Sequence, residues 1–402
     1  MNKYNKIKIF VGITRSVFIL GLVSLFTDFS SQMIFPLIPL FLTTVLGAGA
    51  YVVGIVEGAA ETTASLLQVI SGYWSDKIKK RKPFVLFGYS LSAITKPLFA
   101  FANVWSFVLL VRIIERIGKG LRNAPRDAIV AESCDEGMRG KAYGFHRAMD
   151  GIGSVLGAIL AFLLLPVLGY KNIFLFAFIP GAIAVFIILF IKETNTPTIT
   201  KEKEISFKLS FKELPWDLKF FIVISSIFAL GHFGYAFLLL RAKDIGIADN
   251  TVILLYVIFY VVYTICVIPS GILSDKIGRK PVLMIGYLIF AITSFGLMFA
   301  LNIYSILLLF IIYGIFYALI DGVQRAFVVD LAPKHLKATA LGTYHTAIGL
   351  VALPGKFIAG LLWDKINPET TFLYGLILTI ISMILFIFLK DKTNHEKMGR
   401  RY

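Results

Sequence analysis

Long apolar runs dominate the sequence of this 402-residue chain. A run of about 20 residues is what an α-helix needs to cross roughly 30 Å of hydrocarbon. Only 16% of the residues are charged, against about 25% in soluble domains, which excludes an ordinary water-soluble enzyme. We predict an all-α membrane protein with twelve transmembrane helices, at 16–42, 50–73, 83–102, 105–130, 141–166, 171–191, 218–241, 251–273, 282–300, 303–329, 338–362 and 370–390.

The basic residues indicate how these spans are oriented. The chain has 40 Lys and Arg residues and a formal net charge of +16. Most of those outside the spans lie at the termini and in every second loop, whereas the opposite loops carry only Lys171, Arg241, Lys243 and Lys365. The positive-inside rule therefore places both termini in the cytoplasm of a protein in the cell membrane. The charge marks topology and predicts contact with lipid headgroups, not with nucleic acid.

The second half of the chain repeats the first. The segment GYWSDKIKKRKP at 72–83 corresponds to GILSDKIGRKP at 271–281. The same spacing relates Arg126 to Arg325. Each half holds six predicted spans, so the two halves share one orientation and are related by an axis along the membrane normal.

These features together resemble the major facilitator superfamily of membrane transporters. The resemblance is carried by twelve spans, a parallel six-plus-six repeat and the S-D-K loop motif between spans two and three and between spans eight and nine. It implies two six-helix bundles, related by a pseudo-twofold axis, around a central cavity, and transport by alternating access. We expect the bundles at 1–191 and 218–402, joined by a cytoplasmic linker at 192–217.

Finer motifs are similar to those of the twelve-span drug and metabolite exporters of this superfamily. They are Asp28 in the first span, Arg112 with Glu115 in the fourth, and Gly153 with Gly157 in the fifth. Glutamate stands at Glu115 where the exporters carry glutamine. The resemblance implies export.

Charged residues inside the spans are expensive, because a charge at the bilayer centre costs about 2.5–3.5 kcal/mol. They are concentrated in the first half, and those of the 105–130 span share one helical face. Two interpretations of that face are open: a substrate or proton site, or salt bridges that join spans one, two and four. The candidate residues of a substrate or proton cavity are Asp28, Gln32, Glu57, Glu61, Arg112, Glu115, Arg116, Lys119, Asp150, His232, Tyr260, Tyr313 and Tyr317.

Three acids of this set are the candidate proton carriers: Asp28, Glu61 and Glu115, in that order. A carboxyl group that alternates between an apolar environment and one next to arginine changes its affinity for protons. It can therefore load and release a proton during transport. Lys96 and Lys356, each near a proline, are expected to pair or to extend toward the interface, not to bind substrate.

The second half is poor in charge inside the spans and rich in aromatic residues. Tyr256 and Tyr260 are spaced i, i+4, as are Tyr313 and Tyr317, so each pair shares a helical face. The aromatic residues either pack the helices together or contact a substrate with an apolar or aromatic body.

A second set of residues is expected at the cytoplasmic ends of the spans. The repeat predicts two symmetry-related ion pairs, Asp76 with Arg126 and Asp275 with Arg325, which clamp the inner ends when the transporter faces outward. The complete candidate gate comprises Gly72, Asp76, Arg81, Arg126, Asp275, Arg279 and Arg325.

The soluble segments are too short for a catalytic domain, and the sequence has no P-loop, HExxH, GxSxG or CxxC motif. We therefore expect no enzyme, no metal and no bound cofactor, with a proton gradient as the energy source. The leading hypothesis is a monomeric, proton-coupled exporter of a small organic solute. The alternatives are proton-coupled uptake of an anionic metabolite, bound by the arginines of the 105–130 span, and a non-transporting membrane sensor.

Overall fold

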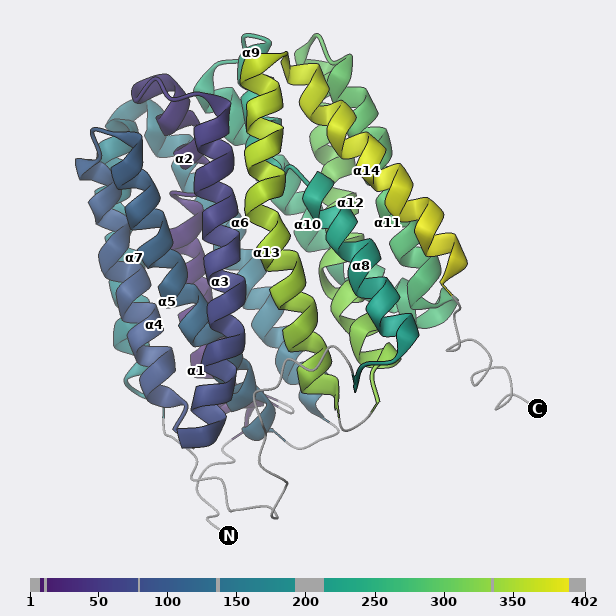
Figure 1. The fold of residues 1–402 in the computed structure, drawn as a ribbon. Helices are drawn as coiled ribbons and strands as arrows, with labels where there is room; N and C mark the ends of the chain where they lie inside the picture. The colour runs from purple at the N-terminus through teal and green to yellow at the C-terminus, as the bar shows by residue number, and fades with distance from the viewer. Residues whose placement is uncertain are drawn as a thin grey trace. The chain divides into compact units, whose positions relative to one another are not determined.

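The computed structural model describes residues 8–10, 13–78, 80–134, 138–191, 213–333 and 336–389. Most of the predicted linker, at 192–212, lies outside these residues. The described chain is almost entirely helical (Figure 1). Its elements are β1 (Lys8–Phe10), β2 (Ile13–Thr14), α1 (Arg15–Gln32), α2 (Leu37–Leu40), η2 (Phe41–Val45), α3 (Ala50–Ile78), α4 (Lys82–Thr95), η3 (Lys96–Phe101), α5 (Trp105–Glu132), α6 (Arg139–Phe176), α7 (Phe178–Ile188), α8 (Trp216–Gly231), α9 (Tyr235–Asp244), α10 (Asp249–Ile277), α11 (Arg279–Met298), α12 (Ile303–Leu331), α13 (Lys337–Lys365) and α14 (Pro368–Phe388).

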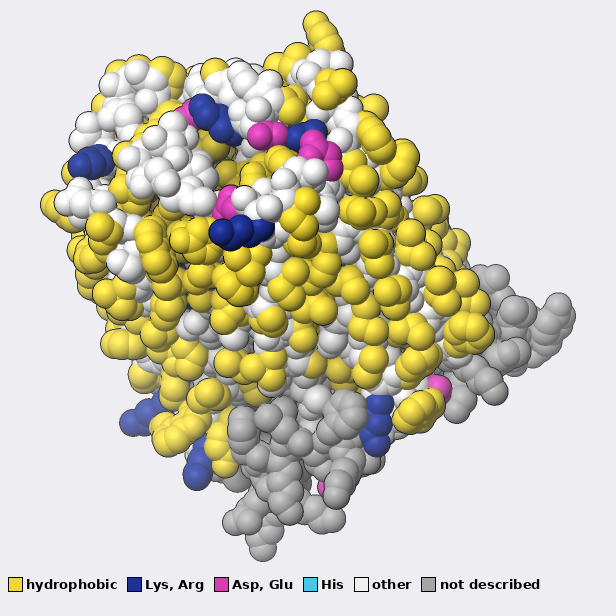
Figure 2. All heavy atoms as spheres, turned by 45° about the horizontal axis from the view of Figure 1, so that its top comes forward, with side chains coloured by type: hydrophobic (Ala, Val, Ile, Leu, Met, Phe, Trp, Pro, Cys, Tyr) yellow, Lys and Arg dark blue, Asp and Glu magenta, His cyan; other side chains and the backbone are white. Residues whose placement is uncertain are grey.

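The helices have the length and surface of membrane-spanning segments. Nine helical segments of the described residues are long and apolar enough to cross a bilayer. Figure 2 shows a broad zone of hydrophobic side chains on the face in view, with charged side chains gathered mainly near its edges. Phe186 on α7 and Phe388 on α14 are 62% and 70% exposed. Large exposed apolar surfaces are rare on soluble proteins, so the prediction of a helical membrane protein is confirmed.

The chain divides into two compact units. The first comprises Met1–Phe41 with Thr63–Lys208, and the second Leu42–Thr62 with Leu209–Tyr402. The division falls within α3. Residues 42–62, which the sequence assigns to the N-terminal bundle, thus belong by their contacts to the second unit.

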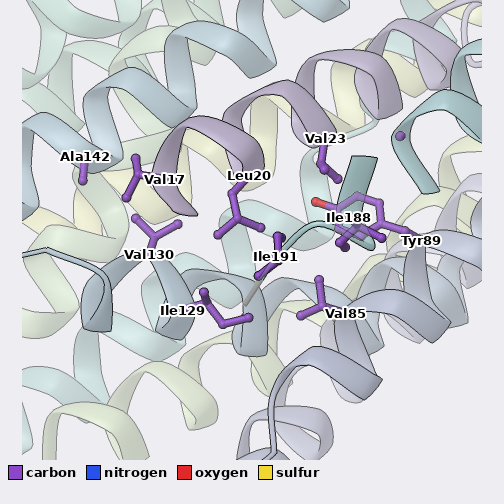
Figure 3. Packing of buried hydrophobic residues seen from close by; sticks show 11 residues of the cluster. Val17, Leu20, Val23, Val85, Tyr89, Ile129, Val130, Ala142, Ile188 and Ile191 are labelled. Atoms are coloured by element: carbon purple, nitrogen blue, oxygen red, sulfur yellow. The ribbon is translucent and has the colours of Figure 1, made fainter. Parts of the chain in front are cut away.

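The core of the first unit lies between α1, α4, α5, α6 and α7. Val17, Leu20 and Val23 recur at helical spacing on α1 and belong to the same buried cluster as Val85 and Tyr89 of α4 (Figure 3). Lipid is as apolar as these side chains, so helices in a bilayer associate mainly through close packing. The neighbouring helix α6 follows this rule, because Gly153 and Gly157 lie against the α1 backbone where a Cβ would collide.

In the second unit, glycines join the first half of α3 to α13. A Cβ on Gly54 would collide with the backbone oxygen of Lys356, and one on Gly58 would lie 2.7 Å from the Cα of Leu353. Asp364 of α13 accepts hydrogen bonds from the backbone nitrogens at the start of α3, at 3.0 Å from Ala50 and 2.8 Å from Tyr51. This close approach explains why residues 42–62 group with the second unit.

Candidate functional site

A buried charge cluster lies in the first half of α5, which is the predicted fourth span. Arg112 and Glu115 are fully buried. Glu115 Oε2 lies 3.4 Å from Arg112 Nη1 and 3.3 Å from Arg116 Nε. Its other oxygen accepts a hydrogen bond from Ser92 of α4 at 3.1 Å. One carboxylate therefore forms ion pairs with two arginines of α5, and its hydrogen bond to Ser92 joins α5 to α4.

The same two arginines pack against Phe35, in the interruption between α1 and α2. Their guanidinium carbons lie 4.1 Å (Arg112) and 4.8 Å (Arg116) from the centre of the ring. Such cation–π contacts contribute more when they are desolvated. In this structure Arg112, Glu115 and Arg116 bind one another and the protein around them. Whether they also bind substrate or a proton stays a prediction.

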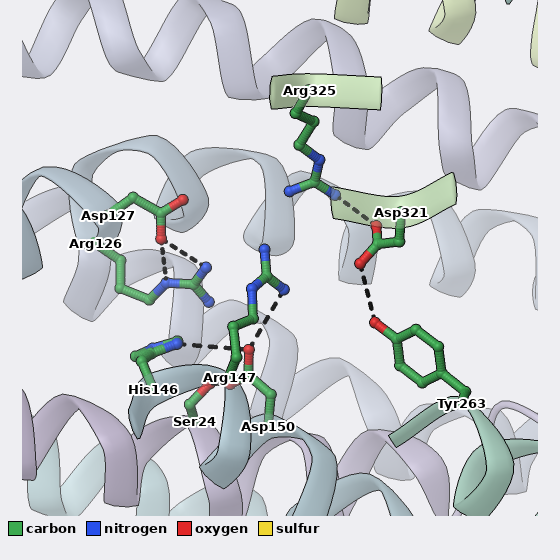
Figure 4. A network of polar contacts seen from close by, with 9 residues as sticks. All are labelled: Ser24, Arg126, Asp127, His146, Arg147, Asp150, Tyr263, Asp321 and Arg325. Carbon is green, nitrogen blue, oxygen red and sulfur yellow. Dashed lines mark hydrogen bonds and ion pairs between the residues drawn. The ribbon is translucent and has the colours of Figure 1, made fainter. Parts of the chain in front are cut away.

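The next turns of α5 carry three further cations. Arg126 binds Asp127 through Nε at 3.0 Å and Nη2 at 2.8 Å (Figure 4). Arg122 is 4% exposed and lies over the ring of Tyr89 at 4.5 Å. Within the described part of the chain, neither Arg122 nor Lys119 forms a hydrogen bond or an ion pair.

Two acids of the first unit face these cations. Asp150 on α6 accepts a hydrogen bond from Ser24, and its Oδ2 lies 3.5 Å from His146 Nδ1 and 3.6 Å from Arg147 Nη1 (Figure 4). Asp28 on α1 interacts electrostatically with Asp150, Lys119, Arg122 and Arg126. Among the described residues it forms no hydrogen bond or ion pair. Asp28, Lys119 and Asp150 of the candidate set thus lie near enough to interact electrostatically, and their role in a substrate or proton cavity stays a prediction.

Lys96 is fully buried in the same unit. Its Nζ donates to the hydroxyl of Ser30 at 2.9 Å and to the backbone oxygen of Thr27 at 3.3 Å. It binds α1 and does not extend to the interface. Gln32, also predicted for the cavity, is buried at the end of α1.

The second unit contains an ion pair that the sequence did not assign. Glu61 of α3 pairs with Lys356 of α13. The Lys356 side chain is 10% exposed and that of Glu61 is 40% exposed. Glu57, one turn earlier on α3, is buried in the same unit. The G-x-x-x-G spacing of Gly54 and Gly58 is a known signal of close helix packing in membranes, and it was the available sequence clue to this contact.

A break between α8 and α9 lies beside this ion pair. Gly234 has φ = 80°, a left-handed conformation that favours glycine. A Cβ at this position would lie 3.6 Å from Cε and 3.7 Å from Nζ of Lys356. His232, within the break, has its Nε2 3.0 Å from the hydroxyl of Tyr313. Lys356 therefore lies against the backbone of an interrupted span.

The predicted tyrosines belong to a large aromatic cluster. Tyr313 is fully buried, and its ring centre lies 5.4 Å from that of Phe259. Tyr317 packs edge-on against the same ring at 5.8 Å, as does Tyr260 at 5.2 Å. These contacts show helix packing; a role in binding substrate stays a prediction.

The expected gate ion pairs have different partners. Arg81 binds Asp76 at 3.1 Å and Glu132 at 2.6 Å. In the second unit Arg279 binds Asp275 at 2.9 Å and Asp330 at 3.1 Å. The pairs Asp76–Arg126 and Asp275–Arg325, expected for an outward-facing transporter, therefore stay a prediction; in this structure these residues have other partners.

The reason lies in helix geometry. Arg126 precedes the end of α5 by more than one turn, about 9 Å along the axis, and it binds Asp127 instead. Arg325 likewise binds Asp321 at 2.9 Å, and Asp321 accepts a hydrogen bond from Tyr263 (Figure 4). The motif arginines lie closer to the loops. The acids Glu132 and Asp330, each near the end of its helix, were the overlooked sequence signal.

The repeat extends to a second contact of the loop motif. Lys82 Nζ donates to the backbone oxygens of Leu189 at 3.0 Å and Ile191 at 2.6 Å. Lys280 donates to those of Ile387 at 3.2 Å and Leu389 at 2.6 Å. Each lysine thus binds the carbonyl groups at the end of the last helix of its half, where the helix dipole favours a cation. Gly72 lies on α3, where an added Cβ would be 3.3 Å from Ala124 of α5.

Comparisons with known proteins agree with this architecture. The sequence profile of the Major Facilitator Superfamily matches residues 20–239 and 219–401. An uncharacterised MFS-type transporter of Methanocaldococcus jannaschii is 43% identical over 385 residues, which cover 94% of this chain and 95% of the relative. A multidrug resistance efflux pump of Streptococcus pneumoniae is 34% identical over 122 residues, 30% of each chain.

The fold is also that of solved transporters. The crystal structure of a mutant of the nucleoside transporter NupG has a TM-score of 0.77 at 15% identity, covering 94% of this chain and 100% of that one. At this identity the likeness concerns the fold alone. Together with the profile match over most of the sequence and the archaeal relative, it leads to one conclusion: the chain belongs to the major facilitator superfamily and is a membrane transporter, not an enzyme.

Proposed function

We propose that this transporter exports a small organic solute across the cell membrane in exchange for protons, by alternating access. The proton coupling rests on Asp28, an intramembrane acid without a hydrogen-bond or ion-pair partner among the described residues. Its neighbours Lys119 and Asp150 have opposite charges, so a change in their distances alters the affinity of Asp28 for a proton. Export is supported by the exporter-like motifs and by the similarity to an efflux pump.

We further propose twelve spans in two six-helix bundles related by a parallel repeat. The apolar segment 141–188 covers most of α6 and all of α7. The helices α3 and α5 have 29 and 28 residues, enough to cross a bilayer, although their charged side chains make them less apolar. The equivalent contacts of Lys82 and Lys280 support the repeat. In this proposal both termini are cytoplasmic, the chain acts as a monomer, and the proton gradient replaces any cofactor.

The proton coupling can be tested in proteoliposomes. The solute is first identified by screening a metabolite and drug library for compounds that raise the thermal stability of the purified protein, because a ligand that binds the folded state stabilises it. We expect transport of that solute against its gradient to stop when the pH gradient is dissipated. Asp28→Asn should abolish gradient-driven transport, because an amide cannot carry the proton. The matched control is Glu213→Gln, at an exposed acid. Unchanged flux without a pH gradient would contradict proton coupling.

The loop contacts of Arg81 and Arg279 support a gate that opens and closes at the cytoplasmic ends. We expect Arg81→Gln and Arg279→Gln each to slow turnover while leaving the apparent solute affinity within about twofold of the wild-type value. Stability should fall by only about 0.2–1 kcal/mol per lost ion pair, because the pairs are partly exposed. Transport kinetics and thermal unfolding check both expectations. A large loss of affinity would place these arginines at the substrate site instead.

A further inference from the structure

Two cations on neighbouring turns of α5 have no acid partner among the described residues. Lys119 and Arg122 are three residues apart, so their side chains lie on the same face of the helix. Arg122 is 4% exposed, and its Nε and Nη1 atoms are buried without a hydrogen-bond acceptor. The hydroxyl of Tyr89, whose ring stacks on Arg122, is also buried without an acceptor. Three buried or half-buried groups that can donate hydrogen bonds therefore share one region.

The unpaired state of Arg122 is costly and calls for a physical reason. Burying a charged group without a hydrogen-bond partner carries a penalty that pairing normally offsets. The ring of Tyr89 attracts the cation, but it leaves the N–H groups of the guanidinium unsatisfied. A residue kept only for stability would be expected to have an acceptor, as Arg112 and Arg126 do.

The acids around these cations already have other partners. The Glu115 carboxylate forms ion pairs with Arg112 and Arg116 and accepts a hydrogen bond from Ser92, and the Asp127 carboxylate forms an ion pair with Arg126. The Asp150 carboxylate accepts a hydrogen bond from Ser24 and lies next to His146 and Arg147. Asp28 supplies one negative charge near Lys119 and Arg122 but lies too far for an ion pair with either. The described part of this region thus has more cations than acids to neutralise them.

We propose that Lys119 and Arg122 bind a carboxylate or phosphate group of the transported solute, with the Tyr89 hydroxyl as a further donor. Arginine suits such a group because its planar fork can give two parallel hydrogen bonds, and lysine adds a mobile point charge. Arg112 and Arg116 are not assigned to this site, because both already contact the Glu115 carboxylate. The inference rests on the proposed transport function and adds the chemical class of the solute: a small organic anion.

The first test measures stability without any ligand. The Lys119→Met and Arg122→Met variants should each raise the melting temperature of the purified protein, by about 2–4 °C for each 1 kcal/mol gained, because each removes an unsatisfied cation from an apolar environment. The matched control Lys171→Met removes an exposed cation and should leave the melting temperature unchanged. If both α5 variants melt at lower temperatures than the wild type, these side chains are structural and the proposal is wrong.

The second test measures anion binding. The probes are benzoate and inorganic phosphate, compared with the uncharged analogue benzamide at constant ionic strength set with chloride. Benzoate and phosphate should stabilise the wild-type protein and the Lys171→Met variant, and benzamide should not. In the two α5 variants binding should be about 10- to 100-fold weaker, the loss expected for one charge-assisted hydrogen bond.

Each outcome decides the proposal. Loss of anion stabilisation in the α5 variants alone supports the site. Stabilisation that persists in both α5 variants, or that is missing from the wild type, contradicts it. Neither measurement uses a pH gradient, so proton-coupled export can fail in proteoliposomes while the anion site stands, and the reverse also holds.

Discussion

Replacing Glu115 by Gln is expected to lower the free energy of unfolding by about 3–5 kcal/mol, the cost of breaking a buried ion pair from one side. Arg112 is fully buried and Arg116 shares the same carboxylate, so the substitution leaves two desolvated cations without their acid. Glutamine keeps the size of the side chain and can still accept the hydrogen bond from Ser92. The measured loss therefore reports charge and not packing. Thermal and denaturant unfolding of the purified protein measure it.

A paired substitution distinguishes the ion pair from a general effect of changing α5. Replacing a whole buried pair by neutral or apolar groups is often neutral or even stabilising. The double variant Arg112→Gln with Glu115→Gln should therefore be more stable than Glu115→Gln alone. Glu213→Gln, at an exposed acid, should have no effect. A Glu115→Gln protein as stable as the wild type would show that Arg112 has another acceptor and that the cluster does not hold α4 and α5 together.

The sequence predicted those features of the fold that depend on local composition. A run of apolar residues can cross the bilayer whatever its neighbours are, so the nine apolar helical segments of the described residues followed from length and composition. The loop motif also repeats locally, and its lysines and arginines make equivalent contacts in both halves. The interruption of α8 and α9 at Gly234 could not be located in this way, because an apolar run does not reveal where its backbone departs from the helix.

The ion-pair partners were harder to predict because they depend on how the helices are rotated and how far long side chains reach. Sequence symmetry paired Asp76 with Arg126. In the structure Arg81, which lies at a helix end, forms ion pairs with both Asp76 and Glu132 instead. The contact of Glu61 with Lys356 joins residues from opposite halves of the chain, and no local spacing indicates it. The charged face of α5 was predictable; which of its cations have acids was not.

Removing the charge of Glu61 is expected to cause the second large loss of stability in this protein. Its partner Lys356 has a side chain that is only 10% exposed, packed beside Gly234 and within a glycine-lined contact of α3 and α13. Glu61→Gln leaves this ammonium group desolvated and unpaired, at an expected cost of about 3–5 kcal/mol. Lys356→Met should cost less, because the Glu61 side chain is 40% exposed and can be hydrated when its partner is lost. This asymmetry is the specific expectation, measured by denaturant unfolding of both single variants.

The double variant Glu61→Gln with Lys356→Met completes a cycle that isolates the interaction of the two side chains. It should recover most of the stability lost in Glu61→Gln, since no unpaired ammonium remains. The charge-reversed double variant, Glu61→Lys with Lys356→Glu, should be more stable than either single reversal. Lys365→Met, an exposed position on the same helix, controls for loss of a lysine from α13. Additive single effects would mean that the ion pair contributes nothing and that the glycine contacts alone hold α3 to α13. A positive coupling energy would instead show that the ion pair holds α3 to α13. The pair would then have to break whenever these two helices separate, so the charge state of Glu61 and Lys356 would affect movement of α3.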